Sequence, residues 1–282
     1  MSRPVERFGL NALVFGLLVI SFLVYNLAGY NYFLDAGLRR WVKLLTPVVV
    51  YLIYSWAKRV DASGVLVRVL YGFFSVSVGF LFVWLLGGFT EYIPWVDLDS
   101  VMGWAILKVG EVVPICLAVL ILGRRNGDSL RSLGLVGGEV GRSLVFGLAA
   151  SVLGFVQYFA MMGVSFPYTV PQFMFWLPWL VLFSVSNGFM EELIFRGLFL
   201  GKYGELFGRR GALLLVSFVF ALFHVILLPF MGLGMVLVFA VFLFFQGYVW
   251  GVIYQRTGSI WGSILAHAVA DVLFVLAAFT PG

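Results

Sequence analysis

The stretch FMFWLPWLVLFSVSNGFMEELIFRGLFL, residues 173–200, decides the fold of this chain. It is mostly apolar and longer than the about 20 residues that a helix needs to cross a bilayer. The whole chain has the same character, since 62% of its 282 residues are hydrophobic, 11% are charged and the mean hydropathy is +1.06. A soluble domain is about a quarter charged. The composition therefore excludes a water-soluble globule, a disordered chain and a disulfide scaffold.

Similar apolar runs recur along the chain and predict an all-α, polytopic transmembrane helix bundle with about eight to nine spans. The runs are continuous rather than alternating, which argues against a transmembrane barrel. Cys116 is the single cysteine, so it excludes an intrachain disulfide and a cysteine metal cluster. We expect spans near residues 9–34, 41–57, 66–87, 103–123, 143–164, 173–200, 211–229, 232–254 and 259–279.

Charged residues between the runs orient the bundle. The segment 88–102 has acidic residues and no Lys or Arg, whereas 124–142 has four Arg residues, and 201–210 and 255–258 are also basic. Basic loops stay in the cytoplasm, so we expect the last three segments inside and the C-terminus outside. The net charge of +5 then belongs to cytoplasmic loops and not to a nucleic-acid surface. Without targeting signals, the expected location is a prokaryotic plasma membrane.

Ionisable residues inside the spans are candidates for function, because each costs at least about 2.5 kcal/mol to insert. The candidates are Lys108, Glu111, Glu191, Glu192, Arg196, His224, His267 and Asp271. Both histidines of the chain belong to this set. From the helical rise, Glu191, His224 and His267 lie at similar depth near the middle of the bilayer. Three helices can thus bring a carboxylate and two imidazoles together as a site that activates water.

Helical spacing divides this set. Glu192 and Arg196 are four apart with the acid first, which predicts an ion pair. Glu191 lies about 100° further round the helix, so Arg196 does not serve it equally. Glu191 is therefore a candidate general base, and a protonated Glu that bonds to a neighbouring helix is the alternative. Lys108 and Glu111, three apart, predict a structural ion pair.

His267 and Asp271 are also four apart and share a helix face. Three interpretations of the pair are open: an acid–base couple, a metal-binding histidine with a supporting carboxylate, or a polar contact between packed helices. His224 has Phe220 one turn before it, so it is either part of the site or packed. Gly247 and the glycine four residues later predict a close approach of helices.

Three sequences around these residues resemble the motifs of one membrane-protein family. EELIFR (191–196) resembles the motif E-E-x-x-x-R, and FALFH (220–224) is similar to F-x-x-x-H. HAVAD (267–271), after the turn RTGS (256–259), resembles H-x-x-x-[N/D]. The family is CPBP, also called ABI, which comprises CAAX-processing proteases and bacteriocin-processing or self-immunity proteins. The likeness covers about residues 175–275, the last four predicted spans.

The resemblance implies an integral-membrane endopeptidase of the Ras-converting type, which removes the last three residues from prenylated CAAX substrates. It implies that Glu191 and His224 activate the attacking water, while Glu192 with Arg196 orients the site. It further implies a catalytic core at 143–282 behind accessory helices at 1–142. The expected partners are the lipid bilayer and a hydrophobic or prenylated peptide, with no nucleic acid and no cofactor.

The resemblance also implies that His267 and residue 271 stabilise the oxyanion. The Ras-converting subgroup has Asn where this chain has Asp271. An ionised carboxylate repels an oxyanion, so we expect Asp271 to be protonated or instead to hold His267.

Other classes of protein stay open at this point. Glu191, His224 and His267 are a possible set of three zinc ligands with an open water position, as in a membrane metalloprotease. No H-E-x-x-H helix supports zinc, however, and a metal-free glutamate mechanism is preferred. A proton-coupled transporter also places ionisable groups at the midplane, but the chain has no inverted repeat. A non-enzymatic immunity or binding protein is the third alternative.

Overall fold

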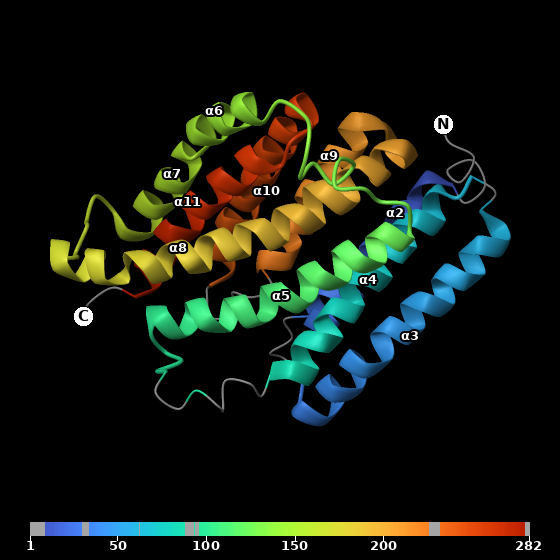
Figure 1. Cartoon of the computed structure of the whole chain (residues 1–282), viewed down its shortest axis with the longest axis horizontal. Helices are drawn as coiled ribbons and strands as arrows, with labels where there is room; N and C mark the ends of the chain where they lie inside the picture. Colours follow the sequence, from blue (N-terminus) through green and yellow to red (C-terminus); the bar gives the residue numbers. More distant parts are fainter. Residues whose placement is uncertain are drawn as a thin grey trace.

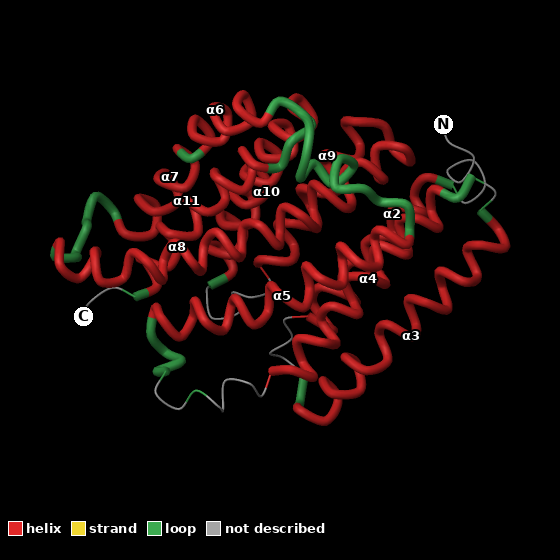
Figure 2. Tube along the Cα trace, in the orientation of Figure 1, coloured by secondary structure: helices red, strands yellow, loops and turns green. Residues whose placement is uncertain are grey.

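The structure, a computed structural model, describes residues 9–29, 34–61, 63–87, 93, 96–225 and 232–279. Over these residues it is all-helical without strands, and the helices lie side by side as a bundle (Figures 1 and 2). The predicted fold class is therefore confirmed. Much of the predicted outer segment 88–102 lies outside the described residues.

The helices follow the predicted runs closely. In chain order they are α2 Leu10–Ser21, η1 Phe22–Gly29, α3 Ala36–Val60, α4 Val65–Leu86, α5 Val101–Arg125, α6 Val140–Ala150, α7 Val152–Met162, α8 Val170–Glu192, η3 Leu193–Leu200, α9 Gly201–Val225, α10 Leu233–Thr257 and α11 Trp261–Ala278. The elements η1 and η3 are π-helices, a rare geometry that often marks functional sites. The predicted boundary between 142 and 143 falls in the first turn of α6, and the division into two parts stays a prediction.

Local sequence explains where several helices begin and end. Asp35 precedes α3, and its carboxylate accepts hydrogen bonds from two backbone N–H groups of the first turn. Thr169 and Gln172 form a capping box at the start of α8. Gly258 ends α10 in the left-handed conformation with φ 66, which glycine adopts without strain.

Seven helical stretches of the described residues are long and apolar enough to cross a membrane. Two features account for the difference from the nine predicted runs. The helix α3, which carries five Lys and Arg residues, is not among the seven. The stretch Val170–Val225 counts once but contains two of the predicted runs. The chain is a multi-pass integral membrane protein.

Gly208 divides Val170–Val225 into two parts that run back along each other. Its φ of 72 and ψ of 169 are not helical, and glycine adopts this conformation more readily than other residues. In a straight helix, Phe195 and Phe220 would be about 37 Å apart. Their ring centroids are 5.3 Å apart, so the chain doubles back between them. This reversal brings the end of α8 beside the end of α9.

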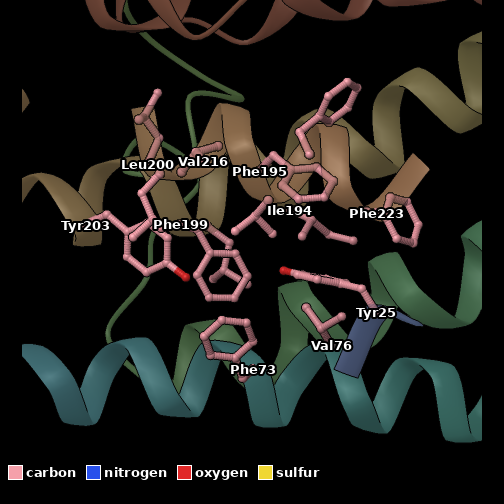
Figure 3. Close-up of a cluster of buried hydrophobic side chains, with 14 of the residues drawn as sticks. Tyr25, Phe73, Val76, Ile194, Phe195, Phe199, Leu200, Tyr203, Val216 and Phe223 are labelled. Carbon is pink, nitrogen blue, oxygen red and sulfur yellow. The ribbon is translucent and has the colours of Figure 1, made fainter. Parts of the chain in front are cut away.

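Helix α8 lies between α5 and α11 (Figure 1). Its continuation η3 packs against the N-terminal helices through an aromatic cluster (Figure 3). We define this cluster as Tyr25, Phe73, Phe195, Phe199 and Phe223, all of which are buried. The rings of Phe73 and Phe199 are closest, with centroids 4.5 Å apart. The N-terminal helices thus support the segment that follows the predicted glutamates.

Helices α9 and α10 approach each other at glycines, as predicted. A Cβ atom on Gly247 would lie 3.2 Å from the ring of Phe220. A Cβ atom on Gly251 would overlap the side chain of Leu213. The absence of side chains at these two positions lets α10 contact the helices that carry the candidate site.

The basic turns meet at one end of the bundle. Lys202 Nζ is 2.6 Å from Asp128 Oδ1, and Arg209 donates a hydrogen bond to the backbone carbonyl of Gln255. These contacts join the three segments that were predicted to face the cytoplasm, so all three lie on the same side of the membrane.

Candidate active site

The predicted site residues lie on adjoining helices. Helix α8 carries Glu191 and Glu192, η3 carries Arg196, α9 carries His224, and α11 carries His267 and Asp271. The carboxylate of Glu191 is at the centre of the group. Its Oε2 atom lies 3.2 Å from His224 Nε2 and 3.8 Å from His267 Nε2. Residues from three separate helices therefore converge, and their catalytic roles stay a prediction.

Arg196 and Glu192 form an ion pair in which both side chains are fully buried. Arg196 Nη1 is 2.7 Å from Glu192 Oε1, which confirms the predicted pair. The other terminal nitrogen, Nη2, donates to the backbone carbonyl of Gly247 at 2.8 Å. The ring of Phe220 also lies against the guanidinium group, with its centroid 4.9 Å from Cζ. A buried ion pair depends on such additional partners, and here they fix the position of Glu192.

Glu192 orients His267. The Nδ1 atom of His267 donates to Glu192 Oε1 at 2.9 Å. Its Nε2 atom is 3.7 Å from Asp271 Oδ1, which is within ion-pair range but longer than a hydrogen bond. Asp271 instead accepts a hydrogen bond from Asn187 Nδ2 at 2.9 Å. The spacing of four on α11 placed Asp271 beside His267, but the orienting hydrogen bond comes from α8.

Trp250 holds the imidazole of His267 from one face. The two rings are stacked with centroids 4.4 Å apart and planes 23° apart. The hydrogen bond from Nδ1 to Glu192 and the indole against one face together fix the orientation of the imidazole ring. That orientation directs Nε2 toward Glu191 and Asp271.

His224 lies beside Glu191, within ion-pair distance. The Nδ1 atom of His224 lies 2.8 Å from the backbone carbonyl oxygen of Phe220, which can only accept, so Nδ1 carries a proton. A neutral imidazole in this tautomer and an ionised carboxylate are both acceptors. At 3.2 Å, Nε2 is within ion-pair range of Glu191 Oε2, but Oε2 has no hydrogen-bond partner within the described part of the chain. It is therefore available to accept a hydrogen bond from water.

A cavity of about 180 Å³ lies against these groups and has room for several water molecules. Most of its wall is aromatic or aliphatic. The polar residues that line it are Lys108, Gln157, Asn187, Glu191, His224, Gln246, His267 and Asp271. Water inside the cavity can therefore contact Glu191 and both histidines.

Several polar residues of this cavity were not predicted from the sequence. Gln246 Nε2 donates to Gln157 Oε1 at 3.0 Å and links α10 to α7. Asn187 is buried beside Asp271, and its Oδ1 atom has no hydrogen-bond partner within the described part of the chain. The sequence feature that could have identified them is the presence of Asn and Gln side chains within apolar helices. An unsatisfied polar group in lipid is costly, so such a side chain indicates a polar partner or a cavity.

Lys108 and Glu111 form the predicted ion pair, with Nζ and Oε2 2.9 Å apart. Lys108 also lines the cavity, which the prediction of a purely structural pair did not include. Helix α5 from the N-terminal part of the chain thus contributes to the site.

Metal binding finds no support in the positions of the side chains. Within the described residues, no three His, Cys, Asp or Glu side chains are grouped so that they could hold a metal ion.

Residues 172–273 match the family described as type II CAAX prenyl endopeptidase, Rce1-like. These residues form an Rce1-like domain. The domain runs from the first turn of α8 into α11 and contains all six predicted site residues. Members of the Rce1-like family are CAAX prenyl endopeptidases, so the domain implies an intramembrane protease and confirms the resemblance found in the sequence. No curated protein and no solved structure matches the chain.

Proposed function

We propose that this chain is an intramembrane endopeptidase that removes the last three residues of membrane-associated, prenylated CAAX substrates with a water molecule activated by Glu191. The observation that carries the proposal is the convergence of Glu191 with His224 and His267 on one cavity of the Rce1-like domain. A carboxylate and two imidazoles supply the acid, the base and the hydrogen-bond donors that peptide hydrolysis needs.

Glu191 acts as the general base. In its ionised form beside His224, the carboxylate accepts a proton from water in the cavity. The oxygen of that water attacks the carbonyl carbon of the substrate. A positioned base contributes about 10²- to 10⁴-fold to the rate of such a step.

His267 stabilises the charge that develops on the carbonyl oxygen. Its Nδ1 atom already donates to Glu192, so a donor at Nε2 requires that the ring carries both protons. Three carboxylates, those of Glu191, Glu192 and Asp271, lie within 3.8 Å of the ring nitrogens. Their negative charge balances an imidazolium at this position. In a site away from bulk water such a donor acts strongly on the oxyanion.

The second half of the reaction returns the proton. Glu191 passes the proton taken from water to the nitrogen of the leaving peptide, and the C–N bond breaks. The products are a shortened substrate with a new carboxylate and a released peptide with a new amine. Glu191 is again an ionised carboxylate beside His224.

The site faces the cytoplasm in this proposal. Lys202 and Arg209 lie at the end of the bundle where the basic turns meet. Cytoplasmic loops are enriched in Lys and Arg. Substrates with lipid attached to their C-terminal region would then reach the cavity from the cytoplasmic leaflet of a prokaryotic plasma membrane.

The test is cleavage of a farnesylated CAAX peptide by the purified full chain in detergent or lipid nanodiscs. We expect the wild-type protein to release the last three residues. Glu191→Gln keeps the size of the side chain but removes the base, so kcat should fall about 10²- to 10⁴-fold.

The matched control is Glu205→Gln, which makes the same change at a half-exposed carboxylate that is paired with Arg68. It should leave kcat unchanged, and circular dichroism should show both variants folded. Wild-type activity that survives in Glu191→Gln contradicts the glutamate mechanism. A wild-type protein that cleaves no CAAX peptide contradicts the proposed activity and leaves the immunity and transporter alternatives.

A further inference from the structure

The cavity contains a cation that the proposed reaction does not use. Within the described part of the chain, Lys108 is the one Lys or Arg that lines it. Lys108 interacts electrostatically with Glu191 and Asp271, and its ammonium group is paired with Glu111. Its side chain is 14% exposed. Burial of a charge at membrane depth is costly, and such a residue is by default part of a functional site.

Lys108 lies beside a row of cavity residues. Phe183, Asn187 and Glu191 follow one another at intervals of four on α8, share one face of the helix, and all line the cavity. Lys108 Nζ is 5.6 Å from the centroid of the Phe183 ring. The base is therefore at one end of the row, and Phe183, whose ring lies near the ammonium group, is at the other.

The length of this row is that of a short peptide. Phe183 and Glu191 are eight residues apart, which is about 12 Å along a helix. Three extended residues span about 10 Å. When the bond that precedes the last three residues lies beside Glu191, the end of the chain thus reaches the neighbourhood of Lys108.

The wall between the two ends suits the backbone and side chains of such a peptide. Phe183, Phe274 and Leu243 give it an apolar surface. Asn187 Oδ1, which is buried and has no partner among the residues described, is an acceptor for a backbone N–H group. The row thus offers contacts of the right chemistry along its whole length.

We infer that Lys108 binds the C-terminal carboxylate of the substrate and thereby sets which peptide bond lies beside Glu191. This inference rests on the proposed function. A carboxylate at this depth needs an opposite charge. An ammonium group has three N–H donors, so Lys108 can hold Glu111 and the substrate at the same time. Lys108 is a residue that determines specificity, and it takes no part in bond cleavage.

The experiment compares two farnesylated CAAX peptides that differ only at the C-terminus, one with a free carboxylate and one with a carboxamide. We expect wild-type kcat/KM to be at least about tenfold higher for the carboxylate peptide, since loss of one partner of a buried charge pair is costly. The ratio of the two kcat/KM values is the readout, because a change in general stability lowers both values together.

Replacement of Lys108 alone would leave Glu111 buried without its cation. The lysine is therefore replaced in a Glu111→Gln background, which by itself should keep the preference for the carboxylate peptide. The double variant Lys108→Met/Glu111→Gln should lose the preference, so that its kcat/KM values for the two peptides agree within about twofold. Lys108→Arg should retain the preference, and Arg68→Met at the surface should not alter it.

The outcomes separate the inference from the proposed function. Equal cleavage of the two peptides by the wild-type protein, or a parallel loss of both in the double variant, overturns the role of Lys108 while the protease activity stands. A wild-type protein that cleaves neither peptide overturns both. A preference that disappears only in the double variant supports the inference.

Discussion

The two sides of η3 and of the last turn of α8 are buried in different ways. On one side, Phe195 and Phe199 enter the aromatic cluster, where each ring touches several others with centroids 4.5–6.5 Å apart. On the other side, Arg196 and Glu192 have specific partners at hydrogen-bond distance. Neighbours in sequence thus belong to two regions, one held by many weak contacts and one by a few directional ones.

This difference indicates which substitutions should change the stability of the protein and which should change its activity. Dispersion contacts in the aromatic cluster are individually small and are shared among many atoms. Each hydrogen bond of the polar site has one geometry, and the loss of one partner leaves the other buried and unsatisfied. We therefore expect substitutions of Phe73 or Phe199, the members of the aromatic cluster furthest from the polar partners, which do not line the cavity, to affect stability alone, and those in the polar site to affect activity.

The largest effect is expected from a substitution of Arg196, which should lower both stability and activity. Arg196→Met leaves Glu192 buried without its cation, which costs about 3–5 kcal/mol in the free energy of unfolding. Because Glu192 also orients His267, we expect activity to be lost as well. Denaturant unfolding in detergent micelles and the peptide cleavage assay measure the two effects.

The double variant Arg196→Met/Glu192→Gln removes both charges and is the control. It should regain most of the lost stability, since a pair replaced as a whole is close to neutral. It should not regain activity, because His267 loses its charged acceptor. A double variant as unstable as the single one would show that packing of Arg196, and not its charge, holds this region together.

A smaller effect is expected from Phe199→Ala in the aromatic cluster. The variant creates a cavity beside Phe73 and should lower the free energy of unfolding by about 3 kcal/mol. The kcat of the protein that remains folded should stay within about twofold of wild type, since no polar partner changes. A loss of kcat comparable to that of Glu191→Gln would mean that the two regions are coupled.

Asn187→Ala sharpens the comparison within the polar site. It removes the hydrogen bond to Asp271, and we expect kcat/KM to fall about tenfold, as for one hydrogen bond to a charged group. The matched control is Ser184→Ala, which removes another buried polar group one turn away. An equal effect of the two changes would assign Asn187 to packing.

The smallest effect is expected from removal of metal. Activity should be unchanged after treatment with a chelator, and metal analysis should find no stoichiometric zinc, because no three potential ligands among the described residues are grouped for a metal ion. About one zinc per chain, with activity lost on chelation and restored by zinc, would overturn the metal-free mechanism.

Much of the fold could be predicted from the apolar runs, because a bilayer demands continuous helices of a set length. The two π-helices could not, since the spacing arguments assume the α-helical period. The predicted count of spans differed at α3, where basic residues lie near both ends of the helix and shorten its uncharged stretch.

The site was predictable where its residues share one helix. The spacing of four between Glu192 and Arg196 gave the correct pair. The partner of His267 was not predictable, because the contact crosses from α11 to α8 and depends on how the helices pack. For the same reason the sequence did not reveal that Lys108 and Gln157 line the same cavity.

Arg196 is held on its far side by a main-chain oxygen, that of Gly247. A carbonyl group is present whichever amino acid occupies the position, so no point mutation on α10 can delete this acceptor. Mutations at 247 act through bulk alone, since even one added carbon would lie 3.4 Å from Nη2. In a library of all substitutions at position 247, we therefore expect activity to decrease as side-chain volume increases and not to depend on polarity. Ala and Ser should be the best-tolerated replacements.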